Sequence, residues 1–268
     1  MPDWIAAIIL GMIEGITEFL PVSSTGHIQL AGRWLRPQSE LFDIVVQCGA
    51  VLAVLAAFQS RLKGFAQTLN TPVTRDYLGK LFVAFAITTV GVLVAEKTGL
   101  KVRKEDVATD AWAIRIAIAT LIGGVLFIAI ESWLRNKKGR TEISWTVALA
   151  VGAAQVLAAT YSGTSRSGAT ILFALALGVA RPAATEFSFL LGVPTLLAAG
   201  AYKFLKAWKA GEIAGENWGA TLLATTVAGI MAFVAVKWLL RYVQTHTFVA
   251  FGWYRIFLGV AILILLLV

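Results

Sequence analysis

The chain has 268 residues, of which 58% are hydrophobic and 14% are charged, and its mean hydropathy is +0.78. A soluble domain would carry about a quarter charged residues, so this composition excludes a water-soluble globular protein and indicates an integral membrane protein. The net charge of +8 comes largely from basic residues in short segments between apolar stretches, a placement typical of membrane topology signals and lipid headgroup contacts, which argues against a nucleic-acid partner.

Eight apolar segments follow one another along the chain. Six of them approach the length of about 20 residues that a membrane-spanning helix needs: 41–59, 77–96, 111–134, 186–205, 219–240 and 249–268. We expect loops between them at 61–76, 97–110, 135–141, 206–216 and 241–246. The other two, 4–35 and 144–180, are interrupted by PVSSTG and SGTSRSG. A helix, a polar break and a short helix predict a re-entrant pair, which enters and leaves the membrane on the same side.

The two interrupted segments resemble one another. At an offset of 141 residues Gly11 aligns with Gly152, Glu14 with Gln155, and Ser24 with Ser165. The sequence therefore predicts one all-α polytopic membrane domain over 1–268, with a first repeat at 1–134 and a second at 144–268. Each repeat would hold a re-entrant pair and three spans, and because three is odd the second would be inverted.

The basic residues near the span ends predict the orientation, because the richer side is usually cytoplasmic. One side holds eleven and the other nine, namely Arg33, Arg36, Lys97, Lys101, Arg103, Lys104, Lys203, Lys206 and Lys209. Both termini and the mouth of the first re-entrant pair are then expected to face outward.

The first break supplies carboxylates, hydroxyls and an imidazole. Glu14 and Glu18 are four residues apart and share one face of a helix, and such oxygen ligands suit Mg²⁺ or Ca²⁺. Ser23, Ser24, Thr25 and His27 follow within the break and at the start of the next helix. At least one of these hydroxyls should cap that helix.

The second break has the composition of an anion cradle. Its glycines let the backbone approach closely, N–H groups at a helix start favour anions, and Arg166 adds a planar fork for phosphate oxygens. The polar residues of this cradle are Gly163, Thr164, Ser165, Ser167 and Thr170. Combined with a cation on Glu14 and Glu18, the cradle predicts hydrolysis of a phosphate or pyrophosphate ester whose tail lies in the bilayer.

EGITEFLPVSSTGH (14–27) and GTSRSGAT (163–170) resemble the two signature segments of the undecaprenyl pyrophosphate phosphatases, the bacitracin-resistance family of bacterial membranes, and EFSFLLGVP (186–194) is also similar. The resemblance implies an inner-membrane enzyme that removes the terminal phosphate of an isoprenoid pyrophosphate lipid, recycles the carrier for peptidoglycan synthesis, needs a divalent cation, and has a pocket open to the outer face. It implies that Glu14, Glu18, Ser24, His27 and Arg166 are catalytic. The family normally has Pro-Gly where this chain has Ser162 and Gly163.

The attacking group stays open among Ser24 activated by His27, His27 itself, and a metal-bound water with Glu18 or His27 as base. A lipid-phosphate flippase or anion transporter is the alternative function, because inverted repeats with broken helices are also transporter architecture. The sequence leaves open the choice between Mg²⁺ and Ca²⁺ and the oligomeric state, a homodimer included.

Overall fold

The computed structural model describes residues 2–32, 34–35, 39–101, 108–135 and 137–267, and within these ranges the chain is helical with no β-strand. The helices are α1 (Asp3–Thr17), α2 (Ser24–Ala31), α3 (Glu40–Ala57), α4 (Gln59–Gln67), α5 (Pro72–Lys97), α6 (Thr109–Trp133), α7 (Trp145–Thr160), α8 (Arg166–Ala176), α9 (Arg181–Lys209), α10 (Trp218–Tyr242) and α11 (Val249–Leu267), with a short 3₁₀ turn, η2, at Glu212–Gly215.

Six of these helices, α3, α5, α6, α9, α10 and α11, are long and apolar enough to cross a membrane. They coincide with the six predicted spans, which confirms the all-α polytopic fold. The loop predicted at 61–76 is wrong over most of its length, because α5 begins at Pro72 and α4 occupies the first part. This short helix is polar on average and has no buried residue, so apolar periodicity gave no sign of it. Its Arg61 donates to the Glu186 carboxylate on α9 at 2.8 Å.

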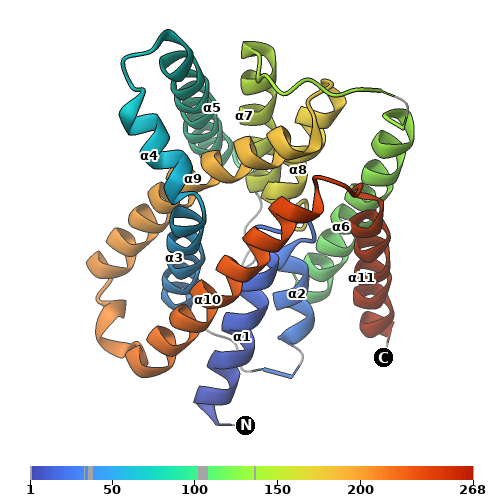
Figure 1. Ribbon diagram of the computed structural model, residues 1–268. Helices are drawn as coiled ribbons and strands as arrows, with labels where there is room; N and C mark the ends of the chain where they lie inside the picture. The colour runs from blue at the N-terminus through green and yellow to red at the C-terminus, as the bar shows by residue number, and fades with distance from the viewer. Residues whose placement is uncertain (1, 33, 36–38, 102–107, 136, 268) are drawn as a thin grey trace.

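The interrupted segments are two helix–break–helix pairs that approach the centre from opposite ends of the molecule. In Figure 1, α1 rises from the lower edge and α2 returns toward it, whereas α7 descends from the upper edge and α8 returns upward. The two pairs therefore run in opposite directions through the molecule.

The contacts of the two pairs are also alike. α1 packs along α10, and α7 packs along α5. Each contact uses a glycine: a Cβ on Gly11 would lie 2.5 Å from the Ala224 carbonyl oxygen, and one on Gly152 would lie 2.9 Å from that of Ala84. Small residues at these points let the backbones come together, as in other membrane helix pairs.

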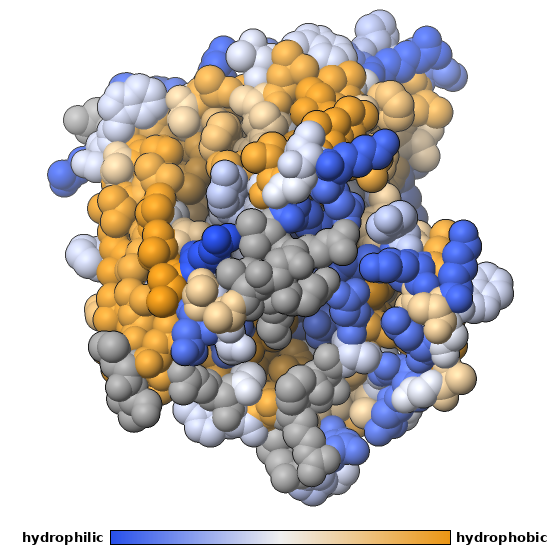
Figure 2. Space-filling view, turned by 180° about the vertical axis from the view of Figure 1, so that it is seen from behind, coloured by the Kyte–Doolittle hydropathy of each residue, from blue (hydrophilic) through white to orange (hydrophobic). Residues whose placement is uncertain are grey.

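The surface matches a membrane protein. Figure 2 shows a tall hydrophobic face on the side that carries α6 and α11, with hydrophilic residues at its upper end. The exposed apolar side chains of these helices include Ile118, Ile122, Phe257 and Ile264. Four of the basic residues behind the predicted orientation, Arg33, Arg36, Arg103 and Lys104, lie outside the described residues.

A buried ion pair joins the two halves far from the polar breaks. Glu131, near the end of α6, is 3% exposed and accepts from Arg181 Nε at 2.8 Å, at the start of α9. It also accepts from the backbone N–H of Phe248 at 2.9 Å, just before α11. One carboxylate therefore holds the ends of three helices.

Replacement of Glu131 by Gln is expected to destabilise the fold, because the change removes the countercharge of Arg181. Breaking a buried pair costs roughly 3–5 kcal/mol, and the partial exposure of Arg181 places the expected loss near the lower limit, about 3 kcal/mol. Thermal unfolding in detergent measures it. Glu142→Gln, an exposed carboxylate in the segment between α6 and α7, is the matched control and should leave the melting temperature unchanged. Equal melting temperatures for both variants would contradict this role of Glu131.

Candidate active site

Both breaks end in the same strained serine cap. Ser23 has φ +72° and its hydroxyl accepts from the Gly26 N–H at the start of α2. Ser165 has φ +68° and caps the Gly168 N–H at the start of α8 at 3.1 Å. A non-glycine residue with positive φ costs about 1–3 kcal/mol and persists only where its surroundings enforce it. The two breaks are therefore built to one local plan.

These caps correct the predicted register of the repeat. Ser165 corresponds structurally to Ser23 and not to Ser24, so Ser24 corresponds to Arg166. The offset of 141 holds for the glycines in α1 and α7, and the second break has one residue more before its cap. Each break thus places one chemically distinctive side chain directly after its cap, a hydroxyl in the first and a guanidinium in the second.

The breaks touch one another directly. The Ser167 hydroxyl, fully buried in the first turn of α8, donates to the Leu20 carbonyl oxygen of the first break at 3.0 Å. This contact brings the first break and the arginine-bearing hairpin together.

A second arginine, which sequence reasoning missed, stabilises that junction. Arg255 on α11 is completely buried, and its guanidinium donates to carbonyl oxygens of both breaks: Pro21 at 3.3 Å, Gly163 at 3.3 Å and Thr164 at 3.0 Å. It also donates to Thr120 on α6 at 3.2 Å. Arg255 therefore satisfies backbone oxygens that have no helical partner, and it fixes the two breaks relative to each other.

The carboxylates lie on the inner face of α1 and at its C-terminal end. Glu18 is 7% exposed, and its Oε2 accepts from the Ser24 hydroxyl at 2.9 Å. Glu14 is 5% exposed, and its Oε1 accepts from the Gln47 amide of α3 at 3.2 Å. The other oxygen of Glu14 has no hydrogen-bond partner among the described residues. A buried oxygen of this kind marks a place for a ligand.

Arg166 faces the same pair of acids. Its Nη2 lies 3.7 Å from Glu18 Oε1, and its guanidinium carbon stands 5.2 Å from the ring centroid of Phe19. Neither Nε nor Nη2 has a hydrogen-bond partner within the described chain, although the side chain is only 13% exposed. The room for it comes from Gly192 on α9, where a Cβ would lie 2.2 Å from Nη1. The guanidinium of Arg166 is therefore held in place, and two of its nitrogens remain able to donate to a ligand.

His27 is held by partners other than Ser24. Its Nδ1 lies 2.8 Å from the Ser23 carbonyl oxygen, and because a carbonyl can only accept, Nδ1 carries the hydrogen. Nε2 then accepts from the hydroxyl of Tyr254 on α11 at 2.7 Å, and the two rings are stacked. The Ser24 hydroxyl donates to Glu18 and not to His27, so the structure does not contain the hydrogen bond through which His27 would activate Ser24.

The remaining predicted residues divide into two groups. Thr25 is exposed on α2 beside the site, and Ser165 lies 3.3 Å from Ser167, hydroxyl to hydroxyl. Gly163 and Thr164 use their carbonyl oxygens to hold Arg255, as described above. Thr170 is fully buried, and its hydroxyl contacts the Ser188 hydroxyl on α9 at 2.5 Å and the Arg166 carbonyl at 2.9 Å. These last three build the scaffold beneath the charged groups.

The donor set suits a divalent cation that shares its coordination shell with substrate. The unpartnered oxygen of Glu14 and the adjacent Glu18 carboxylate supply hard oxygen ligands. Within the described residues no three His, Cys, Asp or Glu side chains form a closed metal site. Mg²⁺ commonly binds through one or two carboxylates with phosphate oxygens and water completing its shell, so these residues fit such an ion.

The similarity of this chain to known proteins extends over almost its whole length. The family model described as "Bacitracin resistance protein BacA" matches residues 7–261. An undecaprenyl-diphosphatase of Rhizobium etli (strain CIAT 652) is 47% identical over 97% of this chain and 96% of its own. Proteins of the same name from Xylella fastidiosa (strain 9a5c) and Xanthomonas axonopodis pv. citri (strain 306) are 44% and 43% identical, each over 98% of this chain and over 98% and 97% of their own.

Proposed function

The chain belongs to the bacitracin resistance protein BacA family, and from that premise we propose that it hydrolyses undecaprenyl pyrophosphate to undecaprenyl phosphate and inorganic phosphate. The single observation that carries the proposal is the meeting of Ser24, Glu18 and Arg166 where two broken helices start. A hydroxyl nucleophile, a carboxylate base and an arginine fork are the groups that phosphoryl transfer needs.

Ser24 is the nucleophile in this proposal, and Glu18 is its base. Ser24 Oγ already donates to Glu18 Oε2 at 2.9 Å, within the range expected of a nucleophile and its base. Oγ forms a bond to the terminal phosphorus while the bond from phosphorus to the bridging oxygen breaks. The Ser24 proton passes to Glu18, and undecaprenyl phosphate leaves. Glu18 then releases this proton to solvent, and a water molecule attacks the phosphoserine phosphorus while the carboxylate takes a proton from that water. The bond from phosphorus to Ser24 Oγ breaks, Oγ takes the proton back from Glu18, and inorganic phosphate leaves.

Arg166 and the helix starts hold the anion. The spare Nε and Nη2 donors of Arg166 would bind oxygens of the terminal phosphate, while the dipoles of α2 and α8 favour negative charge at their N-termini. Because these donors are fixed before substrate arrives, they stabilise the charge that grows on the transferring phosphoryl group without rearranging.

Glu14 and Glu18 would hold a divalent cation, Mg²⁺ or Ca²⁺. When bound, the ion would neutralise phosphate oxygens and let an anionic substrate approach two carboxylates. Gln47 orients Glu14 through its amide, which leaves the second oxygen of that carboxylate for the ion.

His27 on α2 and Tyr254 on α11 contact one another beside the first break. The hydrogen bond from Nδ1 to Ser23 ties the imidazole to the cap that precedes Ser24, so we assign His27 to positioning this segment. Its Nε2, which faces Tyr254, is the one nitrogen able to take a proton in this geometry.

The enzyme would lie in the bacterial inner membrane as an inverted repeat of 1–134 and 144–268. The opposed approach of α1–α2 and α7–α8 and the matched helix contacts support the inverted repeat. The distribution of basic residues over the loops supports a site that opens to the outer face.

Release of phosphate by purified protein in detergent tests the activity and the cation together. We expect undecaprenyl pyrophosphate to release phosphate in the presence of Mg²⁺ or Ca²⁺, chelator to reduce the rate to background, and added cation to restore it. A flippase or anion transporter without hydrolase activity would release none. Full activity in excess chelator would contradict the cation site, and no release with either ion would contradict the hydrolase.

A further inference from the structure

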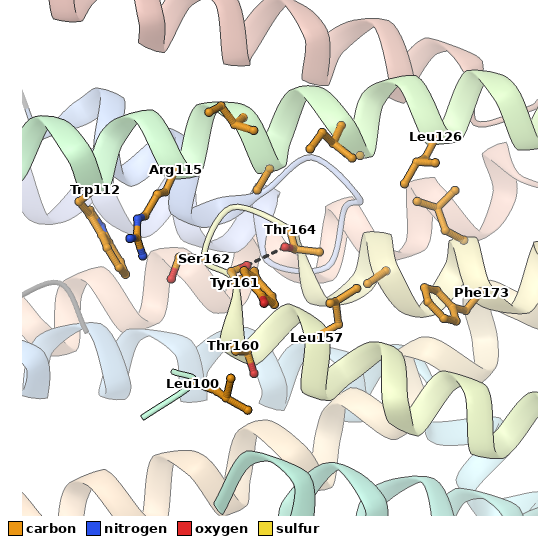
Figure 3. Close-up of a pocket in the computed structure, with 16 residues that line it drawn as sticks. Leu100, Trp112, Arg115, Leu126, Leu157, Thr160, Tyr161, Ser162, Thr164 and Phe173 are labelled. Carbon is orange, nitrogen blue, oxygen red and sulfur yellow. Dashed lines mark hydrogen bonds between the residues drawn. The ribbon is translucent and has the colours of Figure 1, made fainter. Parts of the chain in front are cut away.

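A groove on the far side of the second break is separate from the site above. It has a volume of about 590 Å³ and runs along α6, with α7, α8 and the second break as its other wall. Figure 3 shows Trp112 and Arg115 at one end, Tyr161, Ser162 and Thr164 beside them, and Leu126 and Phe173 at the opposite end. Its lining is thus basic and hydroxylated at one end and apolar at the other.

Arg115 is the charged group of this groove. It is exposed, and among the described residues no carboxylate pairs with it. Arg115 lies 140 residues before Arg255, close to the spacing between the glycines of the repeat. Arg255 uses its guanidinium on backbone carbonyls, whereas the described structure shows no such bonds for Arg115. The guanidinium of Arg115, in the first repeat, therefore has hydrogen-bond donors available for a ligand.

The dimensions suit a lipid. Arg115 lies six residues into α6, about 9 Å along the helix, so its long side chain reaches toward the membrane surface near the helix start. From Arg115 to Leu126 the groove extends about 16 Å, enough for much of an acyl chain. Ser162, which lines the groove next to Arg115, adds a hydroxyl at the basic end.

We propose that this groove binds an anionic membrane lipid, with the phosphate headgroup on Arg115 and Ser162 and one chain along α6. The proposal does not depend on the hydrolase activity. It has a consequence for the enzyme, because the groove is walled by Thr164 and Ala169, which flank Arg166 in the chain. A lipid bound there packs directly behind the segment that positions the active-site arginine.

Native mass spectrometry of the full-length protein in detergent tests the proposal, with phosphatidylglycerol as the anionic probe and phosphatidylcholine as the zwitterionic one. The wild type should bind one phosphatidylglycerol more tightly than any phosphatidylcholine. Arg115→Gln should weaken that binding about fivefold to tenfold, the effect of one phosphate-binding arginine at a membrane surface. Arg166→Ala, which alters only the candidate active site, should retain it.

A pair of matched variants separates the groove from the general lipid surface. Ile122→Trp places a large ring in the groove and should abolish the tight binding. Val125→Trp adds the same ring to an exposed position of α6 outside the groove and should leave the binding intact. Equal affinity of the wild type and Arg115→Gln for phosphatidylglycerol, equal affinity of the wild type for both lipids, or equal losses in the two tryptophan variants would overturn the proposal.

Discussion

Replacement of Arg166 by Ala is expected to lower kcat/KM for undecaprenyl pyrophosphate about 10²–10³-fold. This is the usual effect of removing one fixed hydrogen-bond donor from a site that stabilises transition-state charge. The reason is the position of its guanidinium. Two buried nitrogens of Arg166 have no hydrogen-bond partner among the described residues, so they are free to bind the phosphoryl oxygens. The variant also leaves Glu18 without its cation, which should weaken the binding of an anionic substrate.

Two further variants separate charge from geometry. Arg166→Lys keeps a positive charge but loses the planar fork, so its activity should fall between those of Arg166→Ala and the wild type. Arg61→Ala removes an arginine whose ion pair with Glu186 is largely exposed, and it should leave kcat/KM unchanged. Phosphate release measures all three in detergent, with the melting temperature as a check on folding. Activity of Arg166→Ala within threefold of the wild type would contradict the proposed anion site.

The sequence predicts the spans of this fold well because a membrane core leaves little choice. A segment such as 111–134 must be apolar and helical to cross the bilayer, and α6 occupies Thr109–Trp133. A short helix at the surface has no such constraint. Hydropathy therefore does not predict α4, whose place is set by contacts with other helices, such as the ion pair of Arg61 with Glu186 on α9 at 2.8 Å.

The polar breaks could be predicted for the same physical reason. Glu14, Glu18 and Arg166 stand among apolar residues, and such groups are costly in hydrocarbon unless they are used. The closure of the site could not be predicted, because it depends on residues that lie inside ordinary spans. Arg255 and Arg115 each belong to a strongly apolar helix, six residues from its start, and neither is among the basic residues that predict the orientation. Both, like Arg166, are basic residues within an apolar stretch, and this placement is the sequence signal that marks them.

The roles of the hydroxyls could not be assigned from spacing. Ser23 and Ser24 are adjacent and chemically identical, but one is a cap with positive φ and the other faces Glu18. Likewise Thr170 and Ser167 bond to protein partners far along the chain, Ser188 and Leu20. Only the packing of α8 against α9 and the first break decides which hydroxyl is free. Gln47 and Tyr254, which orient Glu14 and His27, carry no sequence signal of their own.

Replacement of Glu18 by Gln is expected to slow the chemical step about 10²–10⁴-fold, the range for loss of a general base, because Ser24 then has no carboxylate to take its proton. Gln keeps the size of the side chain and can still accept a hydrogen bond from Ser24, so the loss should appear in the single-turnover rate more than in folding. The control must exchange Gln and Glu away from the site, because Gln47→Glu would add a negative charge beside Glu14. Gln244→Glu, at an exposed position beyond α10, tests for a general effect of such exchanges and should leave the rate unchanged.

The same experiment identifies the attacking atom when the labelled terminal phosphate is followed on the protein. Phosphoserine survives an acid quench, whereas phosphohistidine is lost in acid and survives alkali. We therefore expect acid-stable label on the 14–27 segment of the wild type, none in Ser24→Ala, and slower appearance in Glu18→Gln. Label that survives only alkali would identify His27 as the nucleophile, and its Nε2 would first have to give up the hydrogen bond from Tyr254. Direct entry of solvent oxygen into the released phosphate, with no labelled protein under either quench, would instead make Glu18 the base for a water molecule and leave Ser24 as a substrate ligand.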